Sequence, residues 1–291
     1  MRRPCVLWPD DARIAVNFYL VLEAWAGPQA QAGIRVTPDF PREASEAGQR
    51  DWATESWQNY GGQAGFYRLM DVLNEYGVKG SASISALAVE TWPDLVREFV
   101  ATGHEPAGHA YSQEIRLYKL SRDDERTNIR RCVEVFTSIL GERPVGWGSP
   151  GGQRSDRTPT LLLEEGFLWE QDFRDDDVPY IAAEHDGRRL VAMPNTFEIN
   201  DAVLMGRYGN PPGAYVETFR YSFDRLYKEG ERAPKLLTVL VHATHYGRPF
   251  GAHALEQCIQ YAQQFPRVWI ARRRDVAQWY LDHVKELPAN A

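Results

Sequence analysis

The feature that most constrains the fold of this chain is a regular alternation of short apolar segments with amphipathic helical patterns. The first apolar segment, residues 13–22, is rich in β-branched and aromatic residues and alternates too little for a strand with one exposed face. Such a pattern is typical of a buried parallel strand. About seven or eight strand-plus-helix units follow one another, which favours a (β/α) barrel over an open doubly wound sheet. We therefore predict an α/β fold in which residues 1–291 form one barrel domain.

The individual elements are predicted from apolar spacing and from signals at their ends. Ser121 and Asp124 have the Ser-x-x-acid spacing of a helix start, and Gly77 follows an apolar helical pattern as a C-terminal cap. Further strands are predicted at VKGSASISAL, EPAG, PVGWGSP, GFLWEQ, RLVAMP, LLTVLVH and RVWIA, and helices at 66–76, 93–103, 121–140, 159–165, 215–227, 255–265 and 275–284.

One connection is unusually long. Residues at about 24–60 are rich in Gly, Pro and Ala and include Trp25, Trp52, Trp57 and Tyr60. Loops of this length inside a compact domain are usually functional or form interfaces. We expect this loop insertion to cover the mouth of the barrel, with Trp25 as a lid.

Charge and composition narrow the class of ligand. The chain carries a formal net charge of -7 and no long basic run, which argues against nucleic acid or an anionic membrane as the main partner. A hydrophobic content of 43% allows a sizeable core, and no apolar run approaches the ~20 residues that span a bilayer. We expect a small-molecule ligand and a cytoplasmic homo-oligomer whose cysteines, Cys5, Cys132 and Cys258, stay reduced.

Polar side chains follow the predicted strands at the points where the strands end. In a (β/α) barrel these ends face one shared mouth, where active sites lie. Any such residue can instead be a helix cap or a loop anchor, and the acidic run at 174–179 is interpreted as a solvated loop. The argument for function is strongest for His242 and Glu23. An imidazole or a carboxylate at the end of a buried strand is costly to bury unless it has a polar partner or takes part in binding or catalysis. The residues expected at the mouth are Glu23, His109, Trp147, Ser149, Asp172, Asn200, Asp201 and His242.

The segment GHEPAGHAYSQEI raises the question of a metal. His109 follows a short apolar segment, and the residue four positions later is Gln113. Two histidines a short step apart are a common way to hold a divalent ion. Glutamine is a poor substitute for the second histidine.

At these residues the chain resembles the polysaccharide deacetylase superfamily, within it the branch of metal-independent allantoinases and related cyclic-amide hydrolases. The resemblance covers most of the chain from 60 to 249. It implies a distorted seven-stranded (β/α) barrel that acts on carbon–nitrogen bonds other than peptide bonds. The similar stretches are YGGQAGFYRLMDVLNEYGVKGSASISALAVETWPDLVREFVATGHEPAGHAYSQ, RPVGWGSPGGQRSDRTPTLLLEEGF, MPNTFEIND and VHATHYGRP.

The resemblance also assigns roles to single positions. Family members with full deacetylase chemistry carry an aspartate pair after the first strand, and here Val21 and Glu23 stand in place of its general base and its metal ligand. His109 fits the first metal histidine, and Gln113 replaces the second. Gly148 stands where many relatives have the arginine that orients the base.

The family also has a histidine near the last strands, and in this chain His242 stands at that position, with His245 three residues later. A zinc ion held by Glu23, His109 and Gln113 would lack the three good protein ligands of a catalytic zinc site. We therefore expect no tightly bound metal, with Zn²⁺ at these three residues as the alternative.

Three hypotheses about function follow. The first is hydrolysis of an amide-type bond in a small molecule such as a cyclic ureide or imide, with Glu23 as base, His109 beside it and His242 as acid or oxyanion donor. The second is a metal-dependent N-deacetylase of amino sugars, and the third is a non-catalytic binding protein, which the residues Val21 and Gly148 suggest. The residues expected to bind substrate are Trp25, Gln113, Trp147, Ser149, Asp172, Asn200, Asp201 and His245.

Overall fold

The computed structural model describes residues 6–26 and 51–284, and the bounds of its elements are as follows. The strands are β1 (Ile14–Leu22), β2 (Ser81–Ile84), β3 (Glu105–Gly108), β4 (Gly146–Trp147), β5 (Trp169–Glu170), β6 (Tyr180–His185), β7 (Arg188–Ala192), β8 (Lys235–His242) and β9 (Val268–Ile270). The α-helices are α2 (Trp52–Tyr60), α3 (Phe66–Glu75), α4 (Ala86–Thr91), α5 (Pro93–Ala101), α6 (Arg122–Leu140), α7 (Thr158–Glu164), α8 (Pro212–Glu229), α9 (Pro249–Gln263) and α10 (Arg273–His283). A π-helical turn, η3 (Gly61–Gly65), joins α2 to α3, and another, η6 (Ala202–Arg207), precedes α8.

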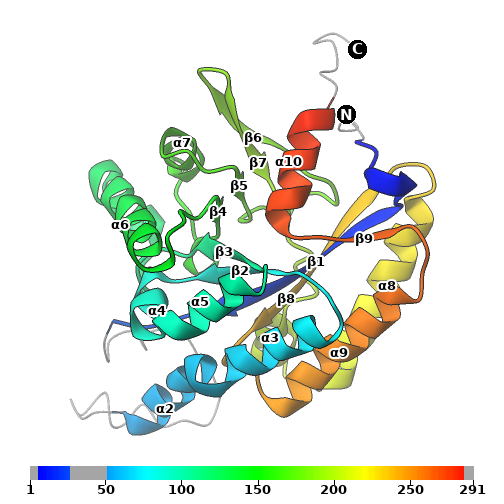
Figure 1. Ribbon diagram of the computed structural model, residues 1–291, viewed down its shortest axis with the longest axis horizontal. Coiled ribbons are helices and arrows are strands. Elements are labelled where there is room, and N and C mark those ends of the chain that lie inside the picture. The colour runs from blue at the N-terminus through cyan, green and yellow to red at the C-terminus, as the bar shows by residue number, and fades with distance from the viewer. Residues whose placement is uncertain (1–5, 27–50, 285–291) are drawn as a thin grey trace.

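The strands form one curled sheet with most of the helices on its outer side (Figure 1), whereas α10 packs against a smaller hydrophobic cluster inside the curl. The order of hydrogen-bonded strands is β6-β7-β5-β4-β3-β2-β1-β8, and β9 also pairs with β1. Every pairing is parallel except that of β6 with β7. The prediction of an α/β fold with a deacetylase-like (β/α) barrel is confirmed.

Alternate side chains of β1 belong to two different cores. Phe18 and Leu20 pack outward with the helices in the larger hydrophobic cluster, whereas Tyr19 and Val21 lie in a smaller cluster inside the curl of the sheet. All of β1 is buried, as expected for a parallel strand that is covered on both faces. The same alternation carries Glu23 to the inner side, just past the carboxyl end of the strand.

The two ends of the curled sheet are tied by polar contacts. Asn200, in the segment after β7, forms an isolated parallel bridge with Leu240 of β8. Arg273 is fully buried, and its guanidinium donates to the Met193 carbonyl at 2.8 Å and to Thr238 Oγ1 at 3.1 Å. Side chains and this segment therefore close the barrel where a continuous ladder of strand hydrogen bonds does not.

The close approach of α3 to the end of β8 depends on a glycine. A Cβ placed on Gly65 would lie 2.1 Å from the carbonyl oxygen of Ala243, so only glycine fits there. Gly65 belongs to the π-helical turn η3, and the contact brings that turn against the chain that directly follows His242. The glycine-rich segment GGQAG therefore positions the helix beside one wall of the barrel mouth.

Three local predictions are wrong. Residues 52–60, predicted as part of the long loop, form α2, whose first turn is capped by the side chain of Asp51; residues 27–50 of that loop lie outside the described part of the chain. Ala86 and Leu87, predicted at the end of a strand, begin α4. The sequence also does not predict β6, which pairs with β7 in a half-exposed hairpin and shows no clear apolar alternation.

The predictions for helix ends and cysteines are confirmed where they can be followed. Ser121 Oγ accepts a hydrogen bond from the backbone nitrogen of Asp124 at 3.1 Å, and Gly77 has the positive φ of 66° that favours glycine. Cys132 and Cys258 are buried free thiols, and Cys5 lies outside the described residues. Across residues 6–26 and 51–284, none of the helices has the length and apolar character needed to cross a bilayer.

Candidate active site

Glu23 and His109 face each other at the carboxyl ends of β1 and β3. Their side chains are 7% and 4% exposed, and His109 Nε2 lies 3.8 Å from Glu23 Oε1, which is longer than a hydrogen bond. His109 Nε2 is buried and has no hydrogen-bond partner among the described residues. A single water or substrate atom at about 2.8 Å from both groups would satisfy them together.

The other ring nitrogen of His109 defines its tautomer. Nδ1 lies 2.6 Å from the carbonyl oxygen of Gly148. A carbonyl oxygen only accepts hydrogen bonds, so Nδ1 carries the proton. In neutral His109, Nε2 therefore presents a lone pair toward Glu23.

Gln113 lies at the same side of the mouth. Its backbone nitrogen donates to the carbonyl of Ala24, the residue after Glu23, at 2.9 Å. The side chain is 5% exposed, and its Oε1 has no hydrogen-bond partner within the described part of the chain. A buried amide oxygen without a donor is costly, and a bound ligand would remove that cost.

At the end of the neighbouring strand β8, where His242 is in register with Val21 of β1, the fully buried Asp201 holds His242 in place. His242 Nδ1 lies 2.6 Å from Asp201 Oδ1, and the His242 backbone nitrogen donates to Oδ2 at 2.7 Å. The two oxygens of Asp201 also accept from the backbone nitrogens of Ala202 at 2.8 Å and Tyr246 at 3.3 Å. Because Asp201 occupies Nδ1, the nitrogen of His242 that remains for a substrate is Nε2.

The surroundings shift the pKa values of Glu23 and His242 in opposite directions. Burial alone would raise the pKa of Glu23, but the neighbouring His109 and the charge of His242 together lower it. Burial alone would lower the pKa of His242, but the charge and hydrogen bond of Asp201, with the charge of Glu23, raise it to about 9. These shifts favour an ionised carboxylate and a protonated imidazole at neutral pH, a base and an acid at the adjacent ends of β1 and β8.

His245 adds a third imidazole. The centre of its ring lies 5.6 Å from that of His242 and 5.1 Å from that of Trp57, which meets it edge-on. Its Nδ1 is 3.1 Å from Thr244 Oγ1. Burial lowers the pKa of His245, so it is neutral beside the charged His242. Trp57 comes from α2, and apolar spacing in the sequence does not indicate that it lies here.

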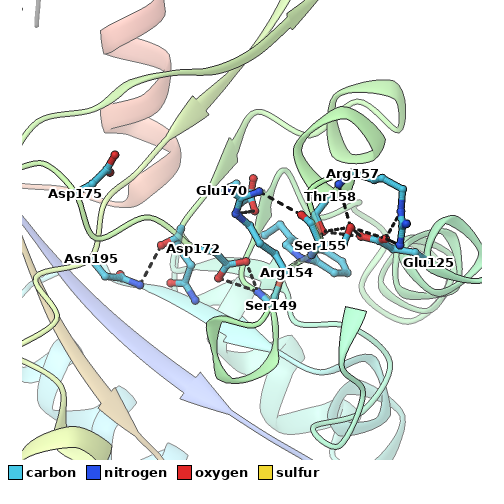
Figure 2. Close-up of polar contacts among 12 residues, drawn as sticks. Glu125, Ser149, Arg154, Ser155, Arg157, Thr158, Glu170, Asp172, Asp175 and Asn195 are labelled. Atoms are coloured by element: carbon cyan, nitrogen blue, oxygen red, sulfur yellow. Dashed lines mark hydrogen bonds and ion pairs between the residues drawn. The ribbon is translucent and has the colours of Figure 1, made fainter. Parts of the chain in front are cut away.

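Other predicted site residues make contacts within the protein. Asp172 accepts hydrogen bonds from the backbone nitrogen of Ser149 on both oxygens, at 3.1 and 2.9 Å (Figure 2). Asn200 Oδ1 accepts from the backbone nitrogen of Ala202 at 3.0 Å, which anchors the start of η6. Trp147 is fully buried in the outer core, and its Nε1 donates to Ser149 Oγ at 3.2 Å.

Trp25 lies beside the mouth. It lines a cavity of about 340 Å³ between the end of β1, α2 and α4, together with Ala24, Ala26, Glu55, Gln58, Asn59, Leu87, Thr91 and Trp92. Among the described residues, the lining of this cavity includes none of Glu23, His109 and His242. Ala24 links the cavity to the site, because its carbonyl accepts a hydrogen bond from the backbone nitrogen of Gln113.

Comparisons with known proteins assign this fold and site to a family. The family model for polysaccharide deacetylase matches residues 59–167. A solved structure described as a "probable Polysaccharide deacetylase" from Pseudomonas aeruginosa PAO1 is 31% identical, with a TM-score of 0.82, and the match covers 98% of this chain and 96% of that one. The chain belongs to the polysaccharide deacetylase family.

Two other similar proteins are described as enzymes of different activity. The structure of Puue allantoinase is 29% identical over 97% of this chain and 94% of its own, with a TM-score of 0.83. Peptidoglycan deacetylase of Helicobacter pylori is 26% identical over 42% of this chain and 41% of its own length. This protein is a hydrolase of carbon–nitrogen bonds other than peptide bonds, with an allantoinase among its structural neighbours.

In this deacetylase-family chain, other side chains fill the space expected for the family's base and arginine. Val21 belongs to the inner core, and a Cβ on Gly148 would lie 2.0 Å from Gln171 Nε2 and 2.7 Å from Ser83 Oγ. Gln171 Nε2 donates to Ser83 Oγ at 3.3 Å, and Ser83 Oγ shares a 2.6 Å hydrogen bond with the Tyr19 hydroxyl. A larger side chain at 148 would therefore require Gln171 to move, and Val21 is packed among apolar residues of the inner core.

The positions of the family's metal ligands do not fit a catalytic zinc ion here. They hold Glu23, His109 and Gln113, which are one carboxylate, one imidazole and one amide. A catalytic zinc ion normally has three ligands from histidine, carboxylate or cysteine side chains. The carboxylate of Glu23 and the imidazole of His109 therefore supply only two of these three ligands.

A second group of possible metal ligands does not suit a metal ion either. Asp201, His242 and His245 offer atoms that all lie within 4.8 Å of one another. Both oxygens of Asp201, however, already accept N–H groups, including Nδ1 of His242. A metal would have to break the Asp201–His242 clamp, so this group is better suited to holding a proton than an ion.

Proposed function

We propose that this protein hydrolyses the amide bond of a small cyclic ureide or imide, without a tightly bound metal. The observation that carries the proposal is the position of Glu23 and His242 at the adjacent ends of β1 and β8, where neighbouring charges and hydrogen bonds lower the pKa of Glu23 and raise that of His242. Hydrolysis of an amide needs a base for the water and an acid for the leaving nitrogen at the same pH. The lowered pKa of Glu23 and the pKa of about 9 for His242 meet both needs at neutral pH.

The protein groups supply each proton transfer in this scheme. Water lies between Glu23 Oε1 and His109 Nε2, which are 3.8 Å apart, and Glu23 takes one proton from it. The oxygen adds to the ring carbonyl carbon, the carbon–nitrogen bond breaks, and Nε2 of His242 gives a proton to the leaving nitrogen. Moving one proton from Glu23 to His242 resets the site. Each of the two positioned groups is expected to contribute about 10²–10⁴-fold to the rate.

Gln113 supports a cyclic substrate over an acetylated sugar. A primary amide presents an N–H and a C=O on the same side, so it pairs through two hydrogen bonds with an amide whose own N–H and C=O are cis. A five- or six-membered ring holds its amide cis, whereas an N-acetyl group prefers trans by about 2.5 kcal/mol. Gln113 is 5% exposed and its Oε1 has no partner among residues 6–26 and 51–284, so its amide oxygen is available to accept one of these two hydrogen bonds.

The proposal is tested on two panels of substrates. The wild-type protein is assayed for ring opening of allantoin, hydantoin, dihydropyrimidines, succinimide and glutarimide, and for acetate release from chito-oligosaccharides and peptidoglycan fragments. Ring opening of at least one compound is expected, and it should be absent in Glu23→Gln. Matched folding of that variant, measured by circular dichroism, is the control.

Two outcomes contradict the proposal. Acetate release from the sugars without ring opening would favour a metal-dependent N-deacetylase, with zinc held by Glu23, His109 and Gln113. Failure on both panels, with and without added zinc, would favour a non-catalytic binding protein.

A further inference from the structure

The peptide group between Gly148 and Ser149 connects two side chains of the barrel mouth. Its carbonyl oxygen accepts from His109 Nδ1 at 2.6 Å. Its N–H, which belongs to Ser149, donates to the two oxygens of Asp172 at 3.1 and 2.9 Å (Figure 2). A carboxylate at the N–H end of a peptide polarises it, and the carbonyl oxygen at the other end becomes a stronger acceptor.

A second carboxyl group, that of Glu170, lies beside Asp172, and the two differ in how well their surroundings stabilise a negative charge. Glu170 is fully buried, and neither of its oxygens has a hydrogen-bond partner among the described residues, although Arg154 Nε lies 3.8 Å from its Oε1 as an ion pair (Figure 2). Burial, and then the charge of Asp172, raise the pKa of Glu170 well above its usual range. Burial also raises the pKa of Asp172, but the hydrogen bonds from Ser149 oppose that rise. Asp172 accepts the Ser149 N–H on both oxygens, whereas Glu170 has only the longer ion pair with Arg154, so the negative charge is favoured on Asp172, beside Ser149.

We infer that Asp172 is a positioning residue that acts through the Gly148–Ser149 peptide to hold the proton of His109 on Nδ1. His109 Nε2 then stays free to accept a hydrogen from the water beside Glu23, and in this respect the inference rests on the proposed function. The arrangement is a histidine–carboxylate pair with one peptide group inserted between the partners. It differs from the substrate-binding role that the sequence predicts for Asp172.

The test is Asp172→Asn, which keeps the size of the side chain and an acceptor for the Ser149 N–H but removes the charge. In ¹⁵N spectra of histidine-labelled protein, with His109→Asn used for assignment, the Nδ1–H tautomer of His109 should lose population. With the ring substrate, kcat should fall about 10-fold while KM stays within about twofold. The matched control is Asp175→Asn in the same loop, whose side chain lies apart from Ser149 in Figure 2 and which should change neither quantity.

The outcomes separate the inference from its alternatives. An unchanged tautomer and an unchanged kcat in Asp172→Asn overturn it, and a higher KM at constant kcat overturns it in favour of direct substrate binding. If Asp172→Asn does not fold, Asp172→Glu, which keeps the charge, should retain the Nδ1–H tautomer, and its loss in a folded protein overturns the inference. Failure of the wild type to open any ring contradicts the proposed function, while the tautomer measurement still tests the role of Asp172.

Discussion

The two sides of the barrel mouth differ in how completely their polar groups are paired. On the side of β8, Asp201 accepts four hydrogen bonds and holds His242 in one orientation. On the side of β1 and β3, His109 Nε2 and Gln113 Oε1 are buried without partners in the part of the chain that the structure describes. The paired side is preorganised to hold a proton, and the unpaired side is built to receive a ligand, because its groups gain most from new hydrogen bonds.

The largest effect that would test this contrast is the loss of the acid or the base. His242→Asn or Glu23→Gln keeps the size of the side chain but removes the titrating group, so kcat for the ring substrate should fall at least about 100-fold in either case. Steady-state kinetics and thermal melts on the two variants and the wild type measure this. Near-normal kcat in a folded variant would remove that residue from the mechanism, and a variant that fails to fold would support a structural role instead.

The second effect concerns the clamp on His242. In Asp201→Asn the charge that raises the pKa of His242 is gone, while burial still lowers it. If that pKa falls from about 9 to about 6.5 or below, the protonated fraction at pH 8 drops by at least about 30-fold. The deficit in rate should therefore be large at pH 8 and shrink as the pH falls towards and below the new pKa of His242.

The wild type should lose activity as pH rises through about 9, because His242 must stay protonated. It should keep activity down to the lowered pKa of Glu23, below which the base is protonated. A pH–rate profile of the two proteins decides this. An equal loss for Asp201→Asn at every pH would point to structural damage instead.

The third effect is on stability and concerns the interior below the mouth. Gly148→Ala places a Cβ 2.0 Å from Gln171 Nε2, so the free energy of unfolding should fall by about 1–3 kcal/mol. Adding Gln171→Ala removes the colliding amide and should restore part of that loss. Urea denaturation of the single and double variants measures it, and a single variant as stable as the wild type would show that Gln171 does not fill the arginine's place.

The smallest effect on kcat is expected when a chelator removes any metal bound at Glu23, His109 and Gln113. Because Glu23, His109 and Gln113 are one ligand short of a catalytic zinc site, dialysis of the wild type against EDTA should change kcat by less than about twofold. Gln113→His supplies the missing ligand and should raise the zinc content measured after gel filtration, with Gln113→His combined with His109→Asn as the control. Stoichiometric zinc in the wild type whose removal abolishes turnover would support the deacetylase reading.

The parts of the fold that follow from local patterns are predicted well from the sequence. The buried strand at 13–22 and the Ser121 cap depend on residues close together in the chain, and both appear in the structure. The hairpin strand β6 is missed because its sequence, YIAAEH, does not alternate between apolar and polar residues and none of its residues is buried. Helix α2 is missed because its residues lie in a segment whose overall composition resembles a loop.

The sequence by itself determined that the chain forms a (β/α) barrel and that Glu23, His109 and His242 end its strands, because apolar periodicity is a local property. The tertiary structure alone decided the partners of these residues. Asp201, 41 residues before His242 in the chain, clamps it, and the peptide that bonds to Asp172 directs His109. Hydrogen bonds between distant segments leave no periodic trace in a sequence, since they depend on how the strands lie side by side in the folded sheet.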